Sequence, residues 1–151
     1  MAQSLAQIHV HIVFSTKDRA PFLKDPSIAG DLHGFMAGVC RKLDSQSVII
    51  GGTDDHVHVF CVLSKSRTIT EVVRDIKRAS SGWIKERDRG LSDFRWQAGY
   101  GAFSVSPGHV APLKRYIQDQ KRHHEKETFQ DEFRKILKKC GVDWDERYVW
   151  D

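Results

Sequence analysis

Hydrophobic and polar residues follow two different periods along this chain, and the alternation between them predicts the order of its secondary structure. Four short segments rich in β-branched and aromatic residues predict β-strands, at residues 8–16, 47–51, 56–63 and 101–106. Apolar residues recur at helical spacing in four others, at residues 26–43, 68–87, 109–125 and 128–139. The predicted order is therefore β-α-β-β-α-β, followed by two further helices.

Local signals support several of these boundaries. Thr68 with Glu71 three residues later forms a capping box at the start of the second helix. Pro112 falls in the first turn of the third helix, and Gly141 follows the end of the fourth. The turn-forming residues 53–55 separate the second and third strands, which favours a hairpin.

This order is that of a ferredoxin-like split βαβ fold, in which helices cover one face of an antiparallel sheet. We therefore predict an α+β fold: a ferredoxin-like split βαβ antiparallel sheet with two extra C-terminal helices. No internal repeat or Pro/Gly-rich linker divides the chain, so residues 1–151 are predicted to form one domain. Many unrelated functions use this fold, so the function has to be inferred from the site.

Composition excludes several classes of protein. Hydrophobic residues make up 40% of the chain and charged residues 29%, which is typical of neither a disordered nor a membrane-built protein. The N-terminal segment lacks the pattern of a secretory signal, so the cytoplasm is the expected compartment. The three cysteines lie far apart without a CxxC pair, which argues against a cysteine zinc site and fits reduced thiols.

Positive charge is concentrated in one part of the chain. The net charge is +4, and residues 65–95 alone hold nine basic and five acidic residues. A solvated helix face is the ordinary explanation, and a nucleic-acid partner is the functional one. If the partner is a nucleic acid, we expect its phosphates to bind basic residues of the second helix and of the segment after the first strand: Arg74, Lys77, Arg78, Lys17 and Arg19.

His56 and His58 form the first candidate site. Residues two apart on a strand share a face, roughly 7 Å apart at Cα, so both imidazoles project together while Val57 points into the core. The pair can bind one divalent metal if a third ligand comes from elsewhere, although such a pair is more often unliganded.

His9 and His11 repeat the same pattern on the first strand. Only the later pair is preceded by carboxylates, Asp54 and Asp55, that could orient its imidazoles. We therefore favour the later pair as ligands, and expect His11 to line the same sheet face or to support a partner.

Tyr116 and Gln120 form the second candidate site. They are four residues apart and share a face of the third helix, so Gln120 could offer an oxygen ligand beside the phenol of Tyr116. A half-buried tyrosine on an amphipathic helix is the ordinary alternative. Four basic neighbours should favour phosphate binding and could lower the phenol pKa, namely Lys114, Arg115, Lys121 and Arg122. For His123 and His124, charge pairing with the helix C-terminus is favoured over a role as ligand or acid/base.

Together these motifs resemble the single-tyrosine transposases of the HUH superfamily, the insertion-sequence class that includes REP-associated tyrosine transposases. The matching segments are HIVFSTKDR, GGTDDHVHVF, GYGAFSVS, YIQDQKRHH and ERYVWD. The resemblance implies that His56, His58 and Gln120 bind a divalent metal, Mg²⁺ or Mn²⁺, and that Tyr116 is the nucleophile. It also implies a homodimer that cleaves and rejoins single-stranded DNA at hairpin-marked ends through a 5′-phosphotyrosine.

This chemistry is physically coherent. A divalent ion stabilises the charge that develops on the phosphodiester, and the covalent tyrosine link lets a 3′-hydroxyl rejoin strands without ATP. Mn²⁺ should bind imidazole at least as well as Mg²⁺ does, because Mg²⁺ prefers oxygen.

Two alternatives remain open at this point. One is a domesticated HUH nickase or relaxase-like endonuclease without transposition. The other is a non-catalytic single-strand nucleic-acid binding domain, which would need exposed aromatic side chains such as Phe14, Phe60 and Phe103.

Apolar residues of the last two helices and the aromatic tail give a separate argument for a dimer. They need a surface to cover them, and a two-fold interface would supply one. Packing of these helices onto their own sheet is the alternative.

Overall fold

The computed structural model describes residues 2–151 and confirms the predicted α+β fold. The strands are β1 (His9–Ser15), β2 (Ser47–Gly52), β3 (His56–Val62) and β4 (Gly101–Val105), in the sheet order β2-β3-β1-β4. Each neighbouring pair is antiparallel, as the ferredoxin-like order requires. The turn at residues 53–55 joins β2 to β3, as predicted.

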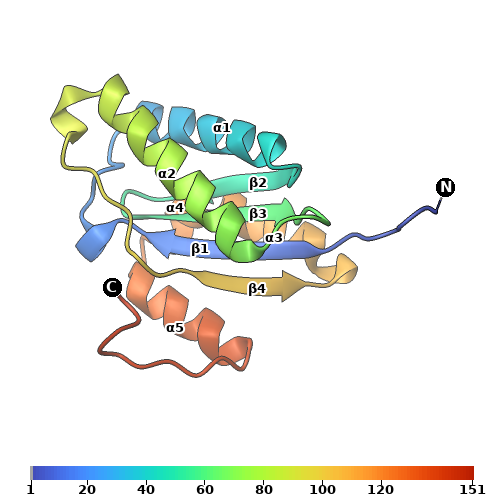
Figure 1. Ribbon diagram of the computed structural model, residues 1–151. Coiled ribbons are helices and arrows are strands. Elements are labelled where there is room, and N and C mark those ends of the chain that lie inside the picture. The colour runs from blue at the N-terminus through green and yellow to red at the C-terminus, as the bar shows by residue number, and fades with distance from the viewer. Residues whose placement is uncertain (1) are drawn as a thin grey trace.

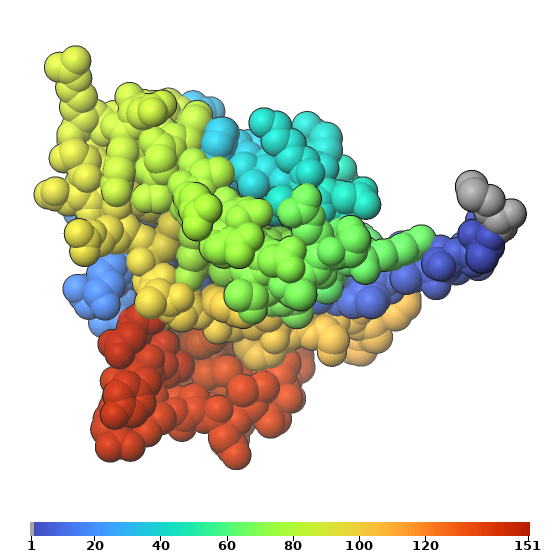
Figure 2. Space-filling view, in the orientation of Figure 1, coloured from blue at the N-terminus to red at the C-terminus, as the bar shows by residue number. Residues whose placement is uncertain are grey.

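Helices cover both faces of this sheet: the two helices of the split βαβ unit share one face, as predicted, and the extra C-terminal helices cover the other. On one side lie α1 (Pro26–Lys42) and α2 (Ile69–Arg87), while α3 (Val110–Gln118), α4 (Gln120–His123) and α5 (Phe129–Lys139) lie on the other (Figure 1). Three short 3₁₀ helices, Lys17–Arg19, Arg89–Leu91 and Pro107–His109, complete the elements. Residues 2–8, before β1, extend away from the body of the molecule (Figure 2).

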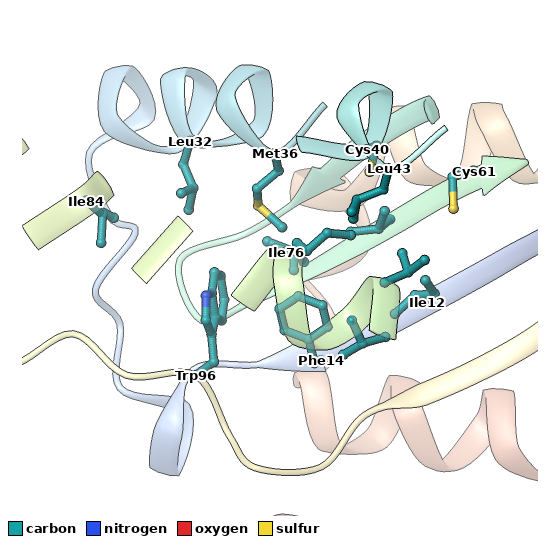
Figure 3. Close-up of a cluster of buried hydrophobic side chains, with 14 of the residues drawn as sticks. Ile12, Phe14, Leu32, Met36, Cys40, Leu43, Cys61, Ile76, Ile84 and Trp96 are labelled. Carbon is teal, nitrogen blue, oxygen red and sulfur yellow. The ribbon is translucent and has the colours of Figure 1, made fainter. Parts of the chain in front are cut away.

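The main core lies between the sheet and the pair α1–α2 (Figure 3). Alternate residues of each central strand point into it, such as Ile12 and Phe14 of β1 and Val57 of β3. From the helices they meet Met36 and Ile76, which are fully buried. The neighbouring positions of the same strands therefore face α3–α5.

A second, smaller core lies on that opposite face. Val13 of β1 and Phe103 of β4 pack against Phe129, Phe133 and Leu137 of α5. The C-terminal tail closes this cluster, with the Trp150 ring 6.1 Å from that of Phe133. The helices thus pack on their own sheet, so the apolar surface from which we predicted a dimer is largely covered within one chain.

Side-chain caps begin three of the helices, and the cap at Thr68 is the one that the sequence predicted. The side chains of Asp25, Thr68 and Thr128 accept backbone N–H groups at the starts of α1, α2 and α5. Gly141 follows α5 with φ +70°, the left-handed conformation that a glycine stop adopts. Among residues 2–151, no helix combines the length and apolarity that crossing a membrane requires.

The predicted helix 109–125 is in fact broken. α3 ends at Gln118, and Asp119 adopts φ −95° and ψ 16°, outside the helical range, before α4 begins. Aspartate is a weak helix former, which makes this position a natural place for the break. Gln120 directly follows the break and is buried.

Candidate active site

β3 carries the predicted histidine pair into the layer between the sheet and α3–α5. His56 and His58 are both 0% exposed, and Val57 between them points into the opposite core. The shared face predicted from the two-residue period is therefore confirmed. Complete burial means that both imidazoles depend on protein partners for their orientation.

Asp55 orients the first imidazole. Its Oδ1 atom lies 2.8 Å from Nδ1 of His56, and the Thr53 hydroxyl is 3.1 Å from the same nitrogen. A proton on Nδ1 is thereby held at the carboxylate, and Nε2 faces the site. Asp54, the other predicted orienting carboxylate, is exposed and makes no such contact.

His11 orients the second imidazole from the neighbouring strand. Its Nε2 lies 2.8 Å from Nδ1 of His58, and the two rings stack with centroids 5.0 Å apart. Burial lowers the pKa of His11 to about 3, so the ring is neutral and can either donate to or accept from His58. His11 thus supports a partner on the same face, as expected, whereas His9 lies against the Phe60 ring.

α3 and α4 bring the predicted tyrosine and glutamine to the same place. Gln120 Oε1 lies 2.8 Å from Nε2 of His56. The ring of Tyr116 stacks on that of His123 at 4.5 Å and meets His58 edge-on at 6.0 Å. The four predicted residues of this chain therefore converge within one molecule.

Glu132 of α5 lies at the centre of the cluster and was not predicted. Its Oε1 is 3.1 Å from Nε2 of His58 and 3.4 Å from Nε2 of His56. Its Oε2 accepts hydrogen bonds from Gln120 Nε2 at 2.7 Å and from the Tyr116 hydroxyl. One carboxylate therefore contacts all four predicted residues.

A sequence signal for Glu132 did exist. Phe129 precedes it by three positions and Ile136 follows by four, so the acid lies on the apolar face of its helix. An acid on such a face is rarely buried without partners. The structure confirms that position, with Glu132 only 1% exposed.

Charge in the cluster is balanced between one carboxylate and several imidazoles. Burial alone would raise the pKa of Glu132, but hydrogen bonds from the surrounding histidines hold it well below its ordinary range. Burial likewise disfavours a charged His56, yet Asp55 and Glu132 together raise the pKa of His56 to about 9. Burial keeps the pKa of His58 below its ordinary value.

The phenol pKa moves in the direction opposite to our expectation. Burial and the negative charge of Glu132 raise the pKa of Tyr116. The four basic neighbours from which we expected a lowered pKa are all exposed to solvent instead: Lys114, Arg115, Lys121 and Arg122. A phenol in this environment keeps its proton until a base removes it.

His124 also joins the cluster, although we expected it to pair with a helix end. Its Nδ1 lies 2.8 Å from the carbonyl oxygen of Glu127. Its Nε2 lies 3.1 Å from Glu132 Oε1. The ring centroid is 4.5 Å from that of His56.

Cavities flank the cluster on two sides. One, of about 690 Å³, lies between α1, β2 and α4 and is lined by His33, Gln120 and Lys121. The other, of about 740 Å³, lies between β4, α3 and α5 and is lined by Tyr116, Glu132 and Lys135. Both are large enough to admit nucleotide-sized groups.

Most of the basic residues predicted to bind phosphate lie away from these cavities. Arg74 and Arg78 are exposed on α2, which covers the opposite face of the sheet. The Lys77 ammonium donates to the carbonyl oxygens of residues 97, 98 and 99 at 2.7–3.2 Å, which gives it a partner within the chain. Lys17 and Arg19 lie after β1, and the Arg19 guanidinium is 5.8 Å from the Trp150 ring centroid.

The donor atoms of the cluster fit a divalent metal. His56, His58 and Glu132 offer ligand atoms that all lie within 4.8 Å of one another. Gln120 Oε1 lies a further 2.8 Å from His56. Imidazole nitrogens with carboxylate and amide oxygens suit first-row transition ions such as Mn²⁺.

The three aromatic rings proposed for a stacking platform are buried. Phe14, Phe60 and Phe103 are 0%, 0% and 7% exposed, so none is open to a base. Phe14 belongs to the main core and Phe103 to the smaller one, while Phe60 lies against His9.

Comparisons with known proteins show a family match and a shared fold. Residues 4–120 match the family model described as "Transposase IS200 like". A crystal structure of a candidate transposase from Deinococcus radiodurans R1 superposes with a TM-score of 0.65 and 21% identity, over 80% of this chain and 95% of that chain. A REP-associated tyrosine transposase bound to a REP hairpin gives 0.52 and 13%, over 80% and 70%. At these identities the structures show a shared fold. A comparison with curated proteins gave no match.

Proposed function

Since this chain belongs to the family of IS200-like transposases, we propose that residues 1–151 act as one domain that cleaves and rejoins single-stranded DNA through Tyr116. The observation that supports this proposal is the convergence of the Tyr116 hydroxyl and three donor residues on one buried carboxylate. A nucleophile held beside a metal-binding cluster is the arrangement that phosphoryl transfer by a covalent intermediate requires.

In this mechanism His56, His58 and Gln120 would hold a divalent ion, Mg²⁺ or Mn²⁺, which would supply positive charge beside the phosphate oxygens. Tyr116 supplies the nucleophilic oxygen, and its proton passes to Glu132 Oε2, to which the hydroxyl already donates. The new bond joins the tyrosine oxygen to phosphorus, and the bond to the 3′-oxygen breaks. That oxygen leaves as a hydroxyl with a proton from solvent, and Glu132 returns the tyrosine proton to solvent, so the step balances.

The raised pKa of Tyr116 gives Glu132 a function in this step. A phenol that stays protonated at neutral pH attacks only if a base takes its proton as the bond forms. Stacking of Tyr116 on His123 fixes the ring and limits the directions in which the hydroxyl can point.

The decisive test replaces the nucleophile. Tyr116→Phe should abolish a covalent protein–DNA adduct with single-stranded oligonucleotides taken from the DNA that flanks its own gene. Binding of the same oligonucleotides should persist, because only one oxygen is lost. Tyr100→Phe and Tyr148→Phe are matched controls, since both hydroxyls lie on exposed residues. If the adduct survives in Tyr116→Phe and disappears in a control variant, the nucleophile is the tyrosine replaced in that control.

The histidine pair is tested in the same assay. His56→Ala and His58→Ala should each remove divalent-ion dependence together with cleavage. His9→Ala is the control, because His9 is on the same sheet face but contacts Phe60 instead of the cluster. Loss of cleavage in His9→Ala alone would refute the assignment.

We further propose that the DNA substrate carries hairpins and that the protein acts as a homodimer. The similar REP-associated transposase is bound to a hairpin, and joining two DNA ends requires two active sites held together. Val142, Trp144 and Tyr148 leave an exposed apolar surface after α5 for such a contact. Sedimentation at micromolar concentration tests it, and a mass near 17.3 kDa would exclude the dimer.

Two finer points complete the proposal. A domesticated endonuclease would share the same site, and a strand-joining assay with a second oligonucleotide separates it from a transposase. The cytoplasm is the proposed compartment, and it suits the free thiols of Cys40, Cys61 and Cys140.

A further inference from the structure

We propose that His124 and Glu132 are metal ligands in addition to His56, His58 and Gln120. The segment that joins α4 to α5 would then complete a site of five donors, three imidazole nitrogens and two oxygens. This inference rests on the proposed metal-dependent function, and it concerns residues beyond the part of the chain that matches the family model, which ends at residue 120.

Separations between the donor atoms support a common ion. Around an octahedral ion with bonds of about 2.1 Å, adjacent ligand atoms lie ~3.0 Å apart. Glu132 Oε1 lies 3.1 Å from Nε2 of His58, 3.4 Å from that of His56 and 3.1 Å from that of His124. Gln120 Oε1 lies 2.8 Å from Nε2 of His56. Each of these separations is close to the distance expected between adjacent ligand atoms of one octahedral ion.

His124 is prepared as a ligand by its own hydrogen bond. Its Nδ1 donates to the carbonyl oxygen of Glu127 at 2.8 Å, which leaves the lone pair on Nε2. Metal-binding histidines are oriented in this way, by a second nitrogen bonded to a backbone carbonyl or a carboxylate. Asp55 orients His56 similarly, so both rings direct Nε2 inward.

Nε2 of His124 is buried and lies 3.1 Å from Glu132 Oε1 within the described residues 2–151. An imidazole nitrogen and a carboxylate oxygen at this distance share either a proton or a cation. A divalent ion can take the place of that proton, because it binds the Nε2 lone pair and the carboxylate oxygen together.

Glu132 needs such a cation as well. Its ion-pair partners within residues 2–151 are the imidazoles of His56, His58 and His124, with no lysine or arginine among them. A buried carboxylate is costly unless it is paired or binds a metal. Oε1 is the atom that faces the nitrogens, so Oε2 stays free to hold the Tyr116 proton.

The donor set identifies the class of ion. Three imidazoles, one carboxylate and one amide favour Mn²⁺, Co²⁺ or Zn²⁺ over Mg²⁺, which prefers an all-oxygen sphere with several waters. Mg²⁺ should therefore bind more weakly than Mn²⁺ by at least a factor of ten.

The test measures metal binding directly, without DNA. Titration of Mn²⁺ into the full chain, followed calorimetrically, compares the wild type with Glu132→Gln and His124→Gln. Loss of either ligand should weaken binding roughly tenfold or more. Asp131→Asn and His109→Gln are matched controls, because both residues are exposed and contribute no atom to the cluster. Wild-type affinity in both ligand variants would overturn the inference.

A second measurement uses the wild type alone, so that a variant that fails to fold does not decide the outcome. In ¹⁵N-histidine-labelled protein, Zn²⁺ should shift the Nε2 resonance of each ligating imidazole. We expect three shifted residues, His56, His58 and His124. Shifts confined to the first two would refute His124 as a ligand.

These outcomes separate the two proposals. If the wild type binds no divalent ion, both the metal-dependent function and this inference are wrong. If the variants that lack Glu132 or His124 bind ions as well as the wild type does, the metal-dependent function remains supported with His56, His58 and Gln120 as ligands. Only the inference about Glu132 and His124 is then wrong.

Discussion

Gly51 sets how closely the tyrosine helix approaches the sheet, and Gly51→Ala should therefore damage both stability and cleavage. Gly51 of β2 pairs with His58 of β3, so it faces the layer between the sheet and α3–α5 that holds the histidines. A Cβ atom at this position would lie 2.8 Å from Cγ2 and 2.9 Å from the carbonyl oxygen of Ile117. Ile117 is the residue after Tyr116 on α3.

The size of the effect follows from these separations. Carbon atoms in contact prefer about 3.5–4.0 Å, so α3 has to retreat by about 1 Å. The obstacle includes backbone, which cannot rotate away as a side-chain end can. Overpacking of this kind costs about 1–3 kcal/mol of unfolding free energy. A displacement of about 1 Å at the nucleophile can cost roughly 100-fold in rate.

The experiment compares two glycine-to-alanine variants. Gly51→Ala should lower the urea midpoint and slow adduct formation, while the circular dichroism of the folded state stays the same. Gly38→Ala is the control, because Gly38 lies on α1 with nothing within 4 Å of the added Cβ. That change should stabilise the protein by about 0.5–1 kcal/mol and leave cleavage unchanged. If Gly51→Ala behaves like Gly38→Ala, the close approach of α3 to β2 does not position Tyr116.

Three further predictions concern other parts of the molecule. Asp55→Asn should weaken Mn²⁺ binding by about 10–100-fold because His56 loses its orienting carboxylate, whereas exposed Asp54→Asn should not; equal calorimetric affinities would contradict this. Thr128→Ala should lower the unfolding free energy by about 1 kcal/mol through loss of the α5 cap, and an unchanged urea midpoint would count against it. Replacing Arg74 and Arg78 with glutamine should make the salt dependence of DNA binding shallower by about 1–2 units of log–log slope; an unaltered slope would mean that both are simply solvated.

Sequence periodicity predicted those parts of the fold that depend on local spacing. The strand period placed His56 and His58 on one face, and the capping residue Thr68 marked the start of a helix. Each of these features depends on residues a few positions apart. The convergence of Tyr116 and Gln120 with the histidines came from the family resemblance, because nothing local relates residues that are about 60 positions apart.

Features that arise from long-range packing were missed. Glu132 enters the site because α5 packs on the second face of the sheet, and residue spacing along the chain does not predict the register of that contact. The direction of the Tyr116 pKa depends on the same contact, since Glu132 and burial outweigh basic neighbours that point to solvent. The helix breaks at Asp119, directly before the buried Gln120, which contacts His56 and Glu132. The spacing of apolar residues along a helix does not predict such contacts with distant residues.

The alternation along β3 has a consequence for folding fidelity. Residues 57, 59 and 61 face the apolar core, and residues 56 and 58 face Gln120 and Glu132 on the other side of the sheet. A slip of one residue against β1 would exchange the two sets, so that imidazoles enter the apolar core without partners and valine replaces them beside Glu132. A misregistered sheet would therefore lose its core and its histidine cluster together. Mispaired molecules should be unstable as well as inactive, and this selects against a stable protein that has folded without its active site.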